Sequence, residues 1–288
     1  MSFERLSKSE IITKVIAYTL LTIFTLIAFY PIVYSFSVSI SGKSAYETGK
    51  ILLLPKNIQF EAYKTVLADN KFWISYANTL YYTVFGTVWS MIISLTGAYA
   101  LAKKRLFGRR VWNFLLVFTM WFSAGLVPKY LNYVALGVDN RLGIVLAFGI
   151  QAFNIILLRN AFEGIPSEIE EAAIIDGANE FQLFRSIYIP MSSAAIATVT
   201  LFYAIGRWNG YYWSMMLIKS ADAQPLQVIL RQKIETFQST DLGIIAVPYA
   251  LDSLIYAIII CSIIPILVIY PYIQKYFARG VNVGGVKG

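Results

Sequence analysis

Histidine is absent from this 288-residue sequence, and cysteine occurs once, as Cys261. These two facts exclude Cys/His zinc sites, Ser/His/Asp and Cys/His catalysis, and any internal disulfide. Charged residues are also scarce, at 14%, whereas roughly a quarter of the residues of an ordinary soluble domain are charged. Hydrophobic residues make up 58% of the chain, and the mean hydropathy is +0.62. This composition indicates a membrane protein and excludes most enzyme chemistry.

Long runs without a charged residue predict where the chain crosses the bilayer, because a charge at mid-membrane costs about 2.5–3.5 kcal/mol on insertion scales. The runs lack the alternation of barrel strands, and a helix satisfies its own backbone polar groups in lipid. We therefore expect an all-α, polytopic membrane protein with six transmembrane helices. The six runs are residues 15–42, 72–102, 111–128, 142–158, 186–206 (extended after Arg207 over 208–218) and 253–274.

Basic residues outnumber acidic ones by 24 to 16, a formal net charge of +8. In a chain that buries most of its surface in lipid, this excess is typical of membrane-flanking loops, and we expect no nucleic-acid partner. The short loop KKRLFGRR, residues 103–110, holds five of the basic residues and therefore belongs in the cytoplasm. Alternation through six spans then predicts two cytoplasmic termini and three external segments, residues 43–71, 129–141 and 219–252.

The first charge-free run follows Arg5 and Lys8, an arrangement that also resembles a signal peptide. The run is 28 residues long, however, and ends without an Ala-x-Ala cleavage pattern, which favours a retained first helix. The external segment 43–71 mixes lysines with carboxylates, and we expect a partly ordered cap there.

Residues 159–190, between the fourth and fifth runs, contain six acidic and two basic residues, a net charge of −4 that violates the positive-inside expectation. Their pattern predicts a helix of about nine residues, with a capping box of Ser167 and Glu170 at its start and Gly177 at its end. So short a helix is marginal in water and needs a packing partner.

One edge of this predicted helix is small and apolar, because Ile169, Ala173 and Gly177 follow one another at four-residue intervals. Another surface could approach such an edge closely. Two partners remain open from the residues alone: the protein's own membrane domain, or the groove of a cytosolic protein.

The same segment resembles a known family. It contains the string Glu171-Ala172-Ala173, then Gly177 after three residues, Ile187 after nine more, and Ile189-Pro190. This spacing resembles the EAA coupling loop of ABC-importer permeases, with Ile189 in place of the usual leucine. The six-run layout and the ending GVNVGGVKG, residues 280–288, are similar to the carbohydrate permeases of the MalG type. Within them, the sequence looks most like the subgroup for complex and uronate-bearing oligosaccharides.

The resemblance implies a type I ABC importer permease fold, with an N-terminal segment (1–71), a core domain (72–276) and a cytoplasmic tail (277–288). It implies a non-catalytic subunit of a bacterial cytoplasmic membrane that imports oligosaccharides by alternating access. The implied partners are a homologous second permease, two cytoplasmic ATPase subunits and an extracytoplasmic solute-binding protein. In the family the coupling loop docks in a cleft of the ATPase, and the matching positions here are Glu171, Ala172, Ala173, Asp176, Gly177, Ile187 and Pro190.

A phosphate-binding loop of the form G-x-x-x-x-G-K-[ST] occurs nowhere in the sequence. ATP and Mg²⁺ would therefore be bound by the partner ATPase subunits, and we expect no cofactor, catalytic residue or metal site in this chain. The external segment 219–252, which contains PLQVILRQKI at residues 225–234, is the expected docking surface for the binding protein. Cys261 is expected to pack as a small hydrophobic residue.

The fifth run contains YAIGRWNGYYWSMM, residues 203–216, in which Arg207 is the only charge. An intramembrane arginine needs a carboxylate partner or a wet cavity, unless it lies close enough to the outer end to snorkel. Aromatic rings beside an amide suit sugars, and an arginine suits carboxylates, although the aromatics could equally form an interfacial belt. A Trp-Asn pair is similar to the sugar-permease pattern. The candidate substrate-pathway residues are Arg207, Trp208, Asn209, Tyr211, Tyr212 and Trp213.

Three rival functions remain. A permease for another solute class, such as amino acids or phosphonate, would share the coupling loop, but the Trp208-Asn209 pair and the GVKG tail favour sugars. A self-contained secondary transporter would predict paired intramembrane carboxylates or inverted repeats, and the sequence shows neither. A membrane enzyme is disfavoured because histidine, a metal cluster and a nucleophile motif are lacking.

Overall fold

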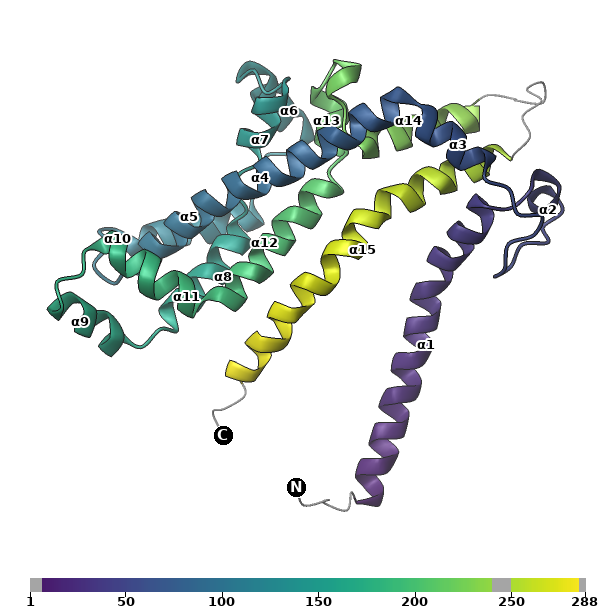
Figure 1. Ribbon diagram of the computed structural model, residues 1–288. Coiled ribbons are helices and arrows are strands. Elements are labelled where there is room, and N and C mark those ends of the chain that lie inside the picture. The colour runs from purple at the N-terminus through teal and green to yellow at the C-terminus, as the bar shows by residue number, and fades with distance from the viewer. Residues whose placement is uncertain (1–6, 240–249, 285–288) are drawn as a thin grey trace. The chain divides into compact units, whose positions relative to one another are not determined.

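The computed structural model describes residues 7–239 and 250–284, which contain helices and turns but no strand (Figure 1). The all-α prediction is therefore confirmed. The longest helices are α1 (Lys8–Ser39), α4 (Asn70–Ala102) and α15 (Leu251–Gly284). The other elements are α2 (Lys43–Glu47), α3 (Glu61–Ala68), α5 (Arg109–Trp121), α6 (Leu126–Ala135), α7 (Arg141–Ala147), α8 (Ala152–Glu163), α9 (Ser167–Ile175), α10 (Glu180–Leu183), the π-helical turn η1 (Phe184–Tyr188), α11 (Ile189–Met191), α12 (Ser193–Trp208), α13 (Tyr212–Leu217), the 3-10 turn η2 (Ala221–Ala223) and α14 (Leu226–Ser239).

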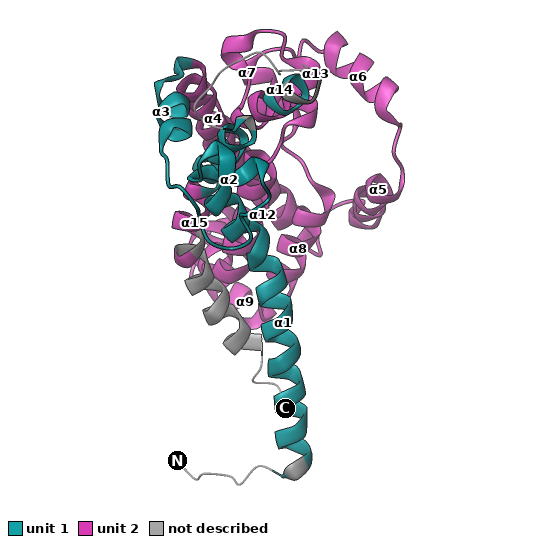
Figure 2. Cartoon of the chain, turned by 90° about the vertical axis from the view of Figure 1, so that its right-hand side faces the viewer, with its two compact units in different colours: residues 1–70, 232–263 teal, residues 71–231, 264–288 magenta. Residues whose placement is uncertain are grey.

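The described residues fall into two compact units, coloured separately in Figure 2. The first unit draws on residues 1–70 and 232–263, and the second on residues 71–231 and 264–288. The division into domains expected from the family resemblance stays a prediction. Parts of two predicted features, residues 240–249 of the external segment and 285–288 of the C-terminal ending, lie outside the described residues.

Six spans result if each bent helix pair is counted as one span. Ser9–Ser39, Asn70–Ala102 and Asp252–Ile269 are each long and apolar enough to cross a membrane alone. Three helix pairs pass the same test only together, with sharp bends between their halves. The pairs are α5 with α6 (116°), α7 with α8 (49°), and Glu180–Met191 with α12 (83°).

The bends correct the expectation of one helix for each charge-free run. In the third run, α5 ends at Trp121, and the chain turns at Gly125, whose φ of +83° lies in the region that favours glycine. In the fourth run, the chain breaks near Gly149, where a Cβ atom would come within 2.8 Å of Trp89 Nε1. That indole instead donates a hydrogen bond to the carbonyl of Leu146 at 3.2 Å. The absence of charge locates a span but carries no information on these contacts.

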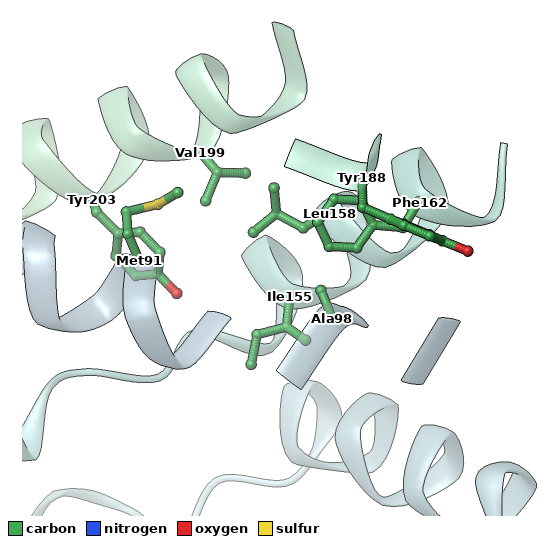
Figure 3. Packing of buried hydrophobic residues seen from close by; sticks show 8 residues of the cluster. All are labelled: Met91, Ala98, Ile155, Leu158, Phe162, Tyr188, Val199 and Tyr203. Carbon is green, nitrogen blue, oxygen red and sulfur yellow. The ribbon is translucent and has the colours of Figure 1, made fainter. Parts of the chain in front are cut away.

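The second unit has a buried core that joins α4, α8 and α12 to the π-helical turn (Figure 3). A hydrogen bond of 2.7 Å between the hydroxyls of Ser94 and Tyr203 also links α4 to α12. The core therefore holds the segments on either side of residues 159–190 in fixed positions. Its buried members are Met91, Ala98, Ile155, Leu158, Phe162, Tyr188, Val199 and Tyr203.

The first unit consists of α1 and the chain that follows it. Val38, Ala45 and Ile51 form a small buried cluster where α1 meets α2. Most of the apolar side chains along α1 are exposed, which is the surface expected of a helix in lipid. The predicted cap, residues 43–71, contains α2 and α3 joined by a loop.

Candidate functional site

The acidic segment 159–190 contains the predicted nine-residue helix, α9. Gly177 ends it with a φ of +85°, as expected. The N–H of Ala178 donates to the carbonyl of Ala173 at 2.9 Å, and the N–H of Gly177 donates to that of Ile174 at 3.0 Å. This pair of bonds is a Schellman motif, in which glycine occupies the left-handed position.

The start of α9 differs from the prediction. Pro166 occupies the N-cap position and Ser167 is the first helical residue, so the expected capping box of Ser167 and Glu170 is wrong. The Glu170 carboxylate is bonded instead to Lys103 and Tyr188. A tertiary contact with a buried cation is stronger than a local cap, and the sequence pattern could not distinguish the two.

The residues matched to the coupling loop divide into two groups. Glu171, Ala172, Asp176 and Gly177 are exposed and Ala173 is half-buried, and these five follow one another along α9 and its end. Farther along the chain, Ile187 packs against the core of the second unit and Pro190 is exposed in α11. The structure thus places the first five together on α9 and at its end, whereas Ile187 and Pro190 lie apart from them.

Two further apolar side chains project from α9, and sequence reasoning missed them. Ile174 is 47% exposed and Ile175 is 85% exposed. Phe181, just beyond the helix, is 65% exposed. A short helix that presents isoleucines to solvent has the surface of a docking element. The signal in the sequence was the pair of isoleucines directly before Asp176.

Lys103, Glu170 and Tyr188 form a network at the inner side of α9, which we call the joint. Lys103 Nζ donates to one Glu170 oxygen at 2.6 Å and to the Tyr188 hydroxyl at 3.1 Å, and that hydroxyl donates to the other Glu170 oxygen. The ammonium also lies 4.5 Å from the ring centroid of Tyr99 and 4.2 Å from that of Tyr188. Only 8% of the Lys103 side chain is exposed, so its charge depends on these partners.

The electrostatics of the joint favour an ionised Glu170. Burial alone would raise the pKa of this carboxyl. The hydrogen bonds from Lys103 and Tyr188, with the positive charges of Lys103 and Arg105, outweigh burial and lower the pKa below its ordinary value. The joint therefore holds a charged pair at neutral pH.

Ion pairs join the acidic segment to the basic loop 103–110. Besides the joint, Arg105 pairs with Glu180 and Arg109 pairs with Glu163. The basic loop 103–110 thus partly neutralises the net charge of −4 in the acidic segment. This pairing accounts for an acidic segment where the positive-inside rule predicts a basic one.

A hollow of about 270 Å³ lies beside α12, and five of the six candidate substrate-pathway residues line it. These are Arg207, Asn209, Tyr211, Tyr212 and Trp213. The sixth, Trp208, is buried elsewhere, with its ring edge-on to Tyr76 at 6.0 Å. The structure adds residues that were not predicted, four from distant segments and four from the stretch 203–216 that holds the candidates themselves. The added lining residues are Tyr82, Ile144, Phe148, Gln151, Tyr203, Gly206, Gly210 and Ser214.

Arg207 caps the break in the fourth span. Its Nη1 donates to the carbonyl of Ile144 at 2.9 Å, and its Nη2 donates to those of Val145 and Phe148 at 3.1 and 2.7 Å. These carbonyls lie where α7 ends, so a distant guanidinium satisfies groups that the helix leaves open. Arg207 thus lines the hollow and is hydrogen-bonded to backbone carbonyls of the protein, and its predicted place in the substrate pathway stays a prediction.

The remaining Arg207 contact is with Ser90, whose hydroxyl lies 3.3 Å from Nη2. Within the described residues, no carboxylate forms an ion pair with Arg207. Most of the guanidinium donors are therefore committed to the protein itself. A hollow beside bent membrane-spanning helices, together with a short exposed helix that an ion pair joins to a basic loop, is typical of a polytopic membrane transport protein.

Residues 4–283 match the family described as the binding-protein-dependent transport system inner membrane component, and the chain belongs to that family. It is 36% identical over 277 residues to the polygalacturonan/rhamnogalacturonan transport system permease protein YtcP of Bacillus subtilis (strain 168), covering 94% of this chain and 96% of that protein. It is 35% identical over 267 residues to Protein LplC of the same organism, covering 91% and 90%.

Two solved structures are also similar. A crystal structure of a bacterial ABC transporter involved in the import of the acidic polysaccharide alginate contains a chain 48% identical to this one, with a TM-score of 0.86, covering 95% of this chain and 99% of that chain. A bacterial alginate ABC transporter in complex with an alginate pentasaccharide-bound periplasmic protein matches with a TM-score of 0.57 at 18% identity, which shows the fold alone.

The chain is thus a multi-pass inner-membrane permease subunit of an ABC importer that works with a solute-binding protein. The predicted importer permease fold is confirmed. Membership of this family makes it a translocation subunit and not an enzyme, and argues against a self-contained secondary transporter.

Proposed function

We propose that this permease subunit moves acidic, uronate-bearing oligosaccharides into the cytoplasm by alternating access. The observation that carries the proposal is the match, over nearly the whole chain, with a chain of an importer of the acidic polysaccharide alginate. The relative named for polygalacturonan and rhamnogalacturonan transport supports the same substrate class.

The lining of the hollow supports a sugar substrate. Tyr211, Tyr212 and Trp213 offer aromatic faces for the apolar C–H surface of a sugar ring, and Asn209 and Gln151 offer amides for its hydroxyls. Arg207 contributes positive charge to the same hollow. Because its donors are mostly bonded to backbone carbonyls, it favours an anionic sugar through its field more than through a bidentate contact.

The proposed assembly contains a homologous second permease subunit, two cytoplasmic ATPase subunits and an extracytoplasmic solute-binding protein. The exposed surface of α9 docks on an ATPase subunit, which binds ATP and Mg²⁺. Both termini then lie in the cytoplasm, as the basic loop 103–110 predicts. This chain itself binds no cofactor and no nucleic acid.

The proposed external segment, residues 219–252, is anchored firmly at its start. The Asn78 amide donates to the carbonyls of Asp222 and Gln224 at 2.8 and 3.1 Å, and the Tyr82 hydroxyl donates to that of Ala223 at 2.7 Å. The first turns of a docking surface for the binding protein would thus be held rigidly on α4.

Transport in vesicles that contain the complete importer tests the substrate class. A uronate oligosaccharide and a neutral oligosaccharide of the same length are supplied with the binding protein, and uptake is measured. Faster uptake of the uronate compound supports the proposal, whereas equal uptake would count against it.

Co-purification tests the assembly. Wild type should recover a second permease and an ATPase from the native membrane, and a Gly177→Asp variant should lose the ATPase. Recovery of the chain alone, with transport intact, would contradict the proposed assembly.

A further inference from the structure

We propose that Lys103, Glu170 and Tyr188 form the joint through which a movement of α9 reaches α4 and α12, and that Glu170 is a positioning residue for coupling. The inference rests on the proposed docking of α9 on an ATPase. It goes beyond that docking because it names the contacts on the other side of the helix, which face the membrane domain.

The first argument is how α9 is held. Within the described chain none of its side chains is fully buried, and a helix of nine residues is marginal by itself. Glu170 is its most firmly bonded side chain, with one carboxylate oxygen held by Lys103 and the other by Tyr188. A force on the exposed face of α9 can therefore reach the membrane domain through this residue, in addition to the short connections at the two ends of the helix.

The second argument is where the partners of Glu170 lie. Lys103 is the first residue after α4, and Tyr188 is the last residue of the π-helical turn that leads through α11 into α12. One carboxylate thus joins α9 to the end of α4, 67 residues away, and to the π-helical turn, 18 residues along the chain. The Tyr188 ring lies in the buried core beside Leu158 and Phe162, and its hydroxyl points out of that core (Figure 3). A shift of the hydroxyl therefore moves a residue embedded in the core.

The third argument is the stiffness of the contact. A cation that is 8% exposed, bonded to a carboxylate and enclosed by two aromatic rings cannot easily separate from its partner, because the separated charges would be left unsatisfied. The π-helical turn at Tyr188 and the 83° bend that follows are points at which a helix can change direction. Because the contact does not separate, a displacement of α9 moves Tyr188 with it, and the bend that follows allows α12 to change direction in response.

The fourth argument is the path beyond the joint. α12 carries Arg207, which caps the end of α7 beside the hollow. A displacement at Tyr188 thus has a continuous route through α12 to the wall of the proposed substrate pathway. Such a route counts as coupling only when its energetic effect is measured.

The experiment uses the complete importer in vesicles and measures sugar transported per ATP hydrolysed. The variants are Glu170→Gln and Tyr188→Phe, and the second removes only a hydroxyl. The matched control is Glu180→Gln, which breaks the pair with Arg105 between the same two segments and leaves the charge of Arg105 near Glu170 in place. The two side chains of that pair are exposed, Arg105 by 60% and Glu180 by 52%, so the pair should contribute little to coupling.

We expect both variants to co-purify with the ATPase as wild type does, while transport per ATP falls by about tenfold, within the range of ordinary coupling energies. The control should keep the wild-type ratio. The double variant should be no worse than Glu170→Gln alone, because the two residues belong to one network.

Two outcomes would overturn the inference. One is an unchanged transport ratio in both variants. The other is loss of the ATPase from Tyr188→Phe, which would make the network a requirement for docking or folding. If Gly177→Asp in parallel keeps the ATPase, the docking proposal itself has failed, and the two failures are thus distinguished.

Discussion

The guanidinium of Arg207 fits against the backbone of α4 because residue 86 is a glycine. A Cβ atom on Gly86 would come within 2.8 Å of Arg207 Nε. Arg207 can therefore cap the broken fourth span only because Gly86, in the second span, has no Cβ atom. This close approach explains why a glycine occupies this position in the regular helix α4.

A Gly86→Ala substitution should displace Arg207 and release the carbonyls at the end of α7. We expect destabilisation by about 1–3 kcal/mol, as for other overpacked sites, although alanine itself favours helix. Thermal unfolding of the purified permease measures the change. Gly97→Ala in the same helix is the control, because a Cβ atom there meets nothing within 4 Å. Equal stability of the two variants would contradict the close approach.

Arg207→Lys should slow transport without changing the preference of the importer for acidic over neutral oligosaccharides. A lysine ammonium has only three donors at a single point and cannot span the carbonyls of Ile144, Val145 and Phe148 as the guanidinium does. We expect the maximal transport rate to fall by a similar factor for a uronate oligosaccharide and for its methyl ester. A loss confined to the free acid would show that Arg207 binds the substrate carboxylate directly.

Gly177 should tolerate asparagine better than alanine or valine. Its φ of +85° strains any residue with a Cβ atom, at a cost of about 1–2 kcal/mol, although the surrounding space is open. Asparagine visits this region more readily, so the Schellman motif should survive. ATPase recovery on co-purification should decrease in the order Gly, Asn, Ala, Val. Recovery that followed side-chain volume alone, with Ala above Asn, would indicate a steric contact instead.

Coupling through Glu170 should be insensitive to mild acid. Lys103, Tyr188 and Arg105 face this carboxyl, and its pKa is lowered in the folded protein. The contribution of the ionised form is present above the unfolded pKa of about 4.3 and is lost as the pH falls through the lower folded value. Transport per ATP should therefore stay constant from about pH 7.5 to about pH 5. A decline centred near pH 6 that is absent from Glu170→Gln would contradict the lowered pKa.

Charge and hydropathy along the chain determine where this protein enters the membrane. The six charge-free runs correspond to three long helices and three bent pairs, because excluding charge from lipid is a property of each segment by itself. The local sequence also determined where α9 ends, because the left-handed backbone position after the helix favours glycine, and Gly177 occupies it.

The tertiary structure alone decided which polar groups meet. Lys103 and Glu170 are 67 residues apart, and Arg207 reaches carbonyls 59 to 63 residues before it. Sequence reasoning assigned Glu170 to a local cap and Arg207 to a substrate or to the membrane surface. In the structure Glu170 bonds to a buried lysine and Arg207 bonds to the carbonyls at the end of α7, groups that distant segments bring to them. Burial makes an unpaired charge or carbonyl costly, so packing, and not local pattern, selects the partner.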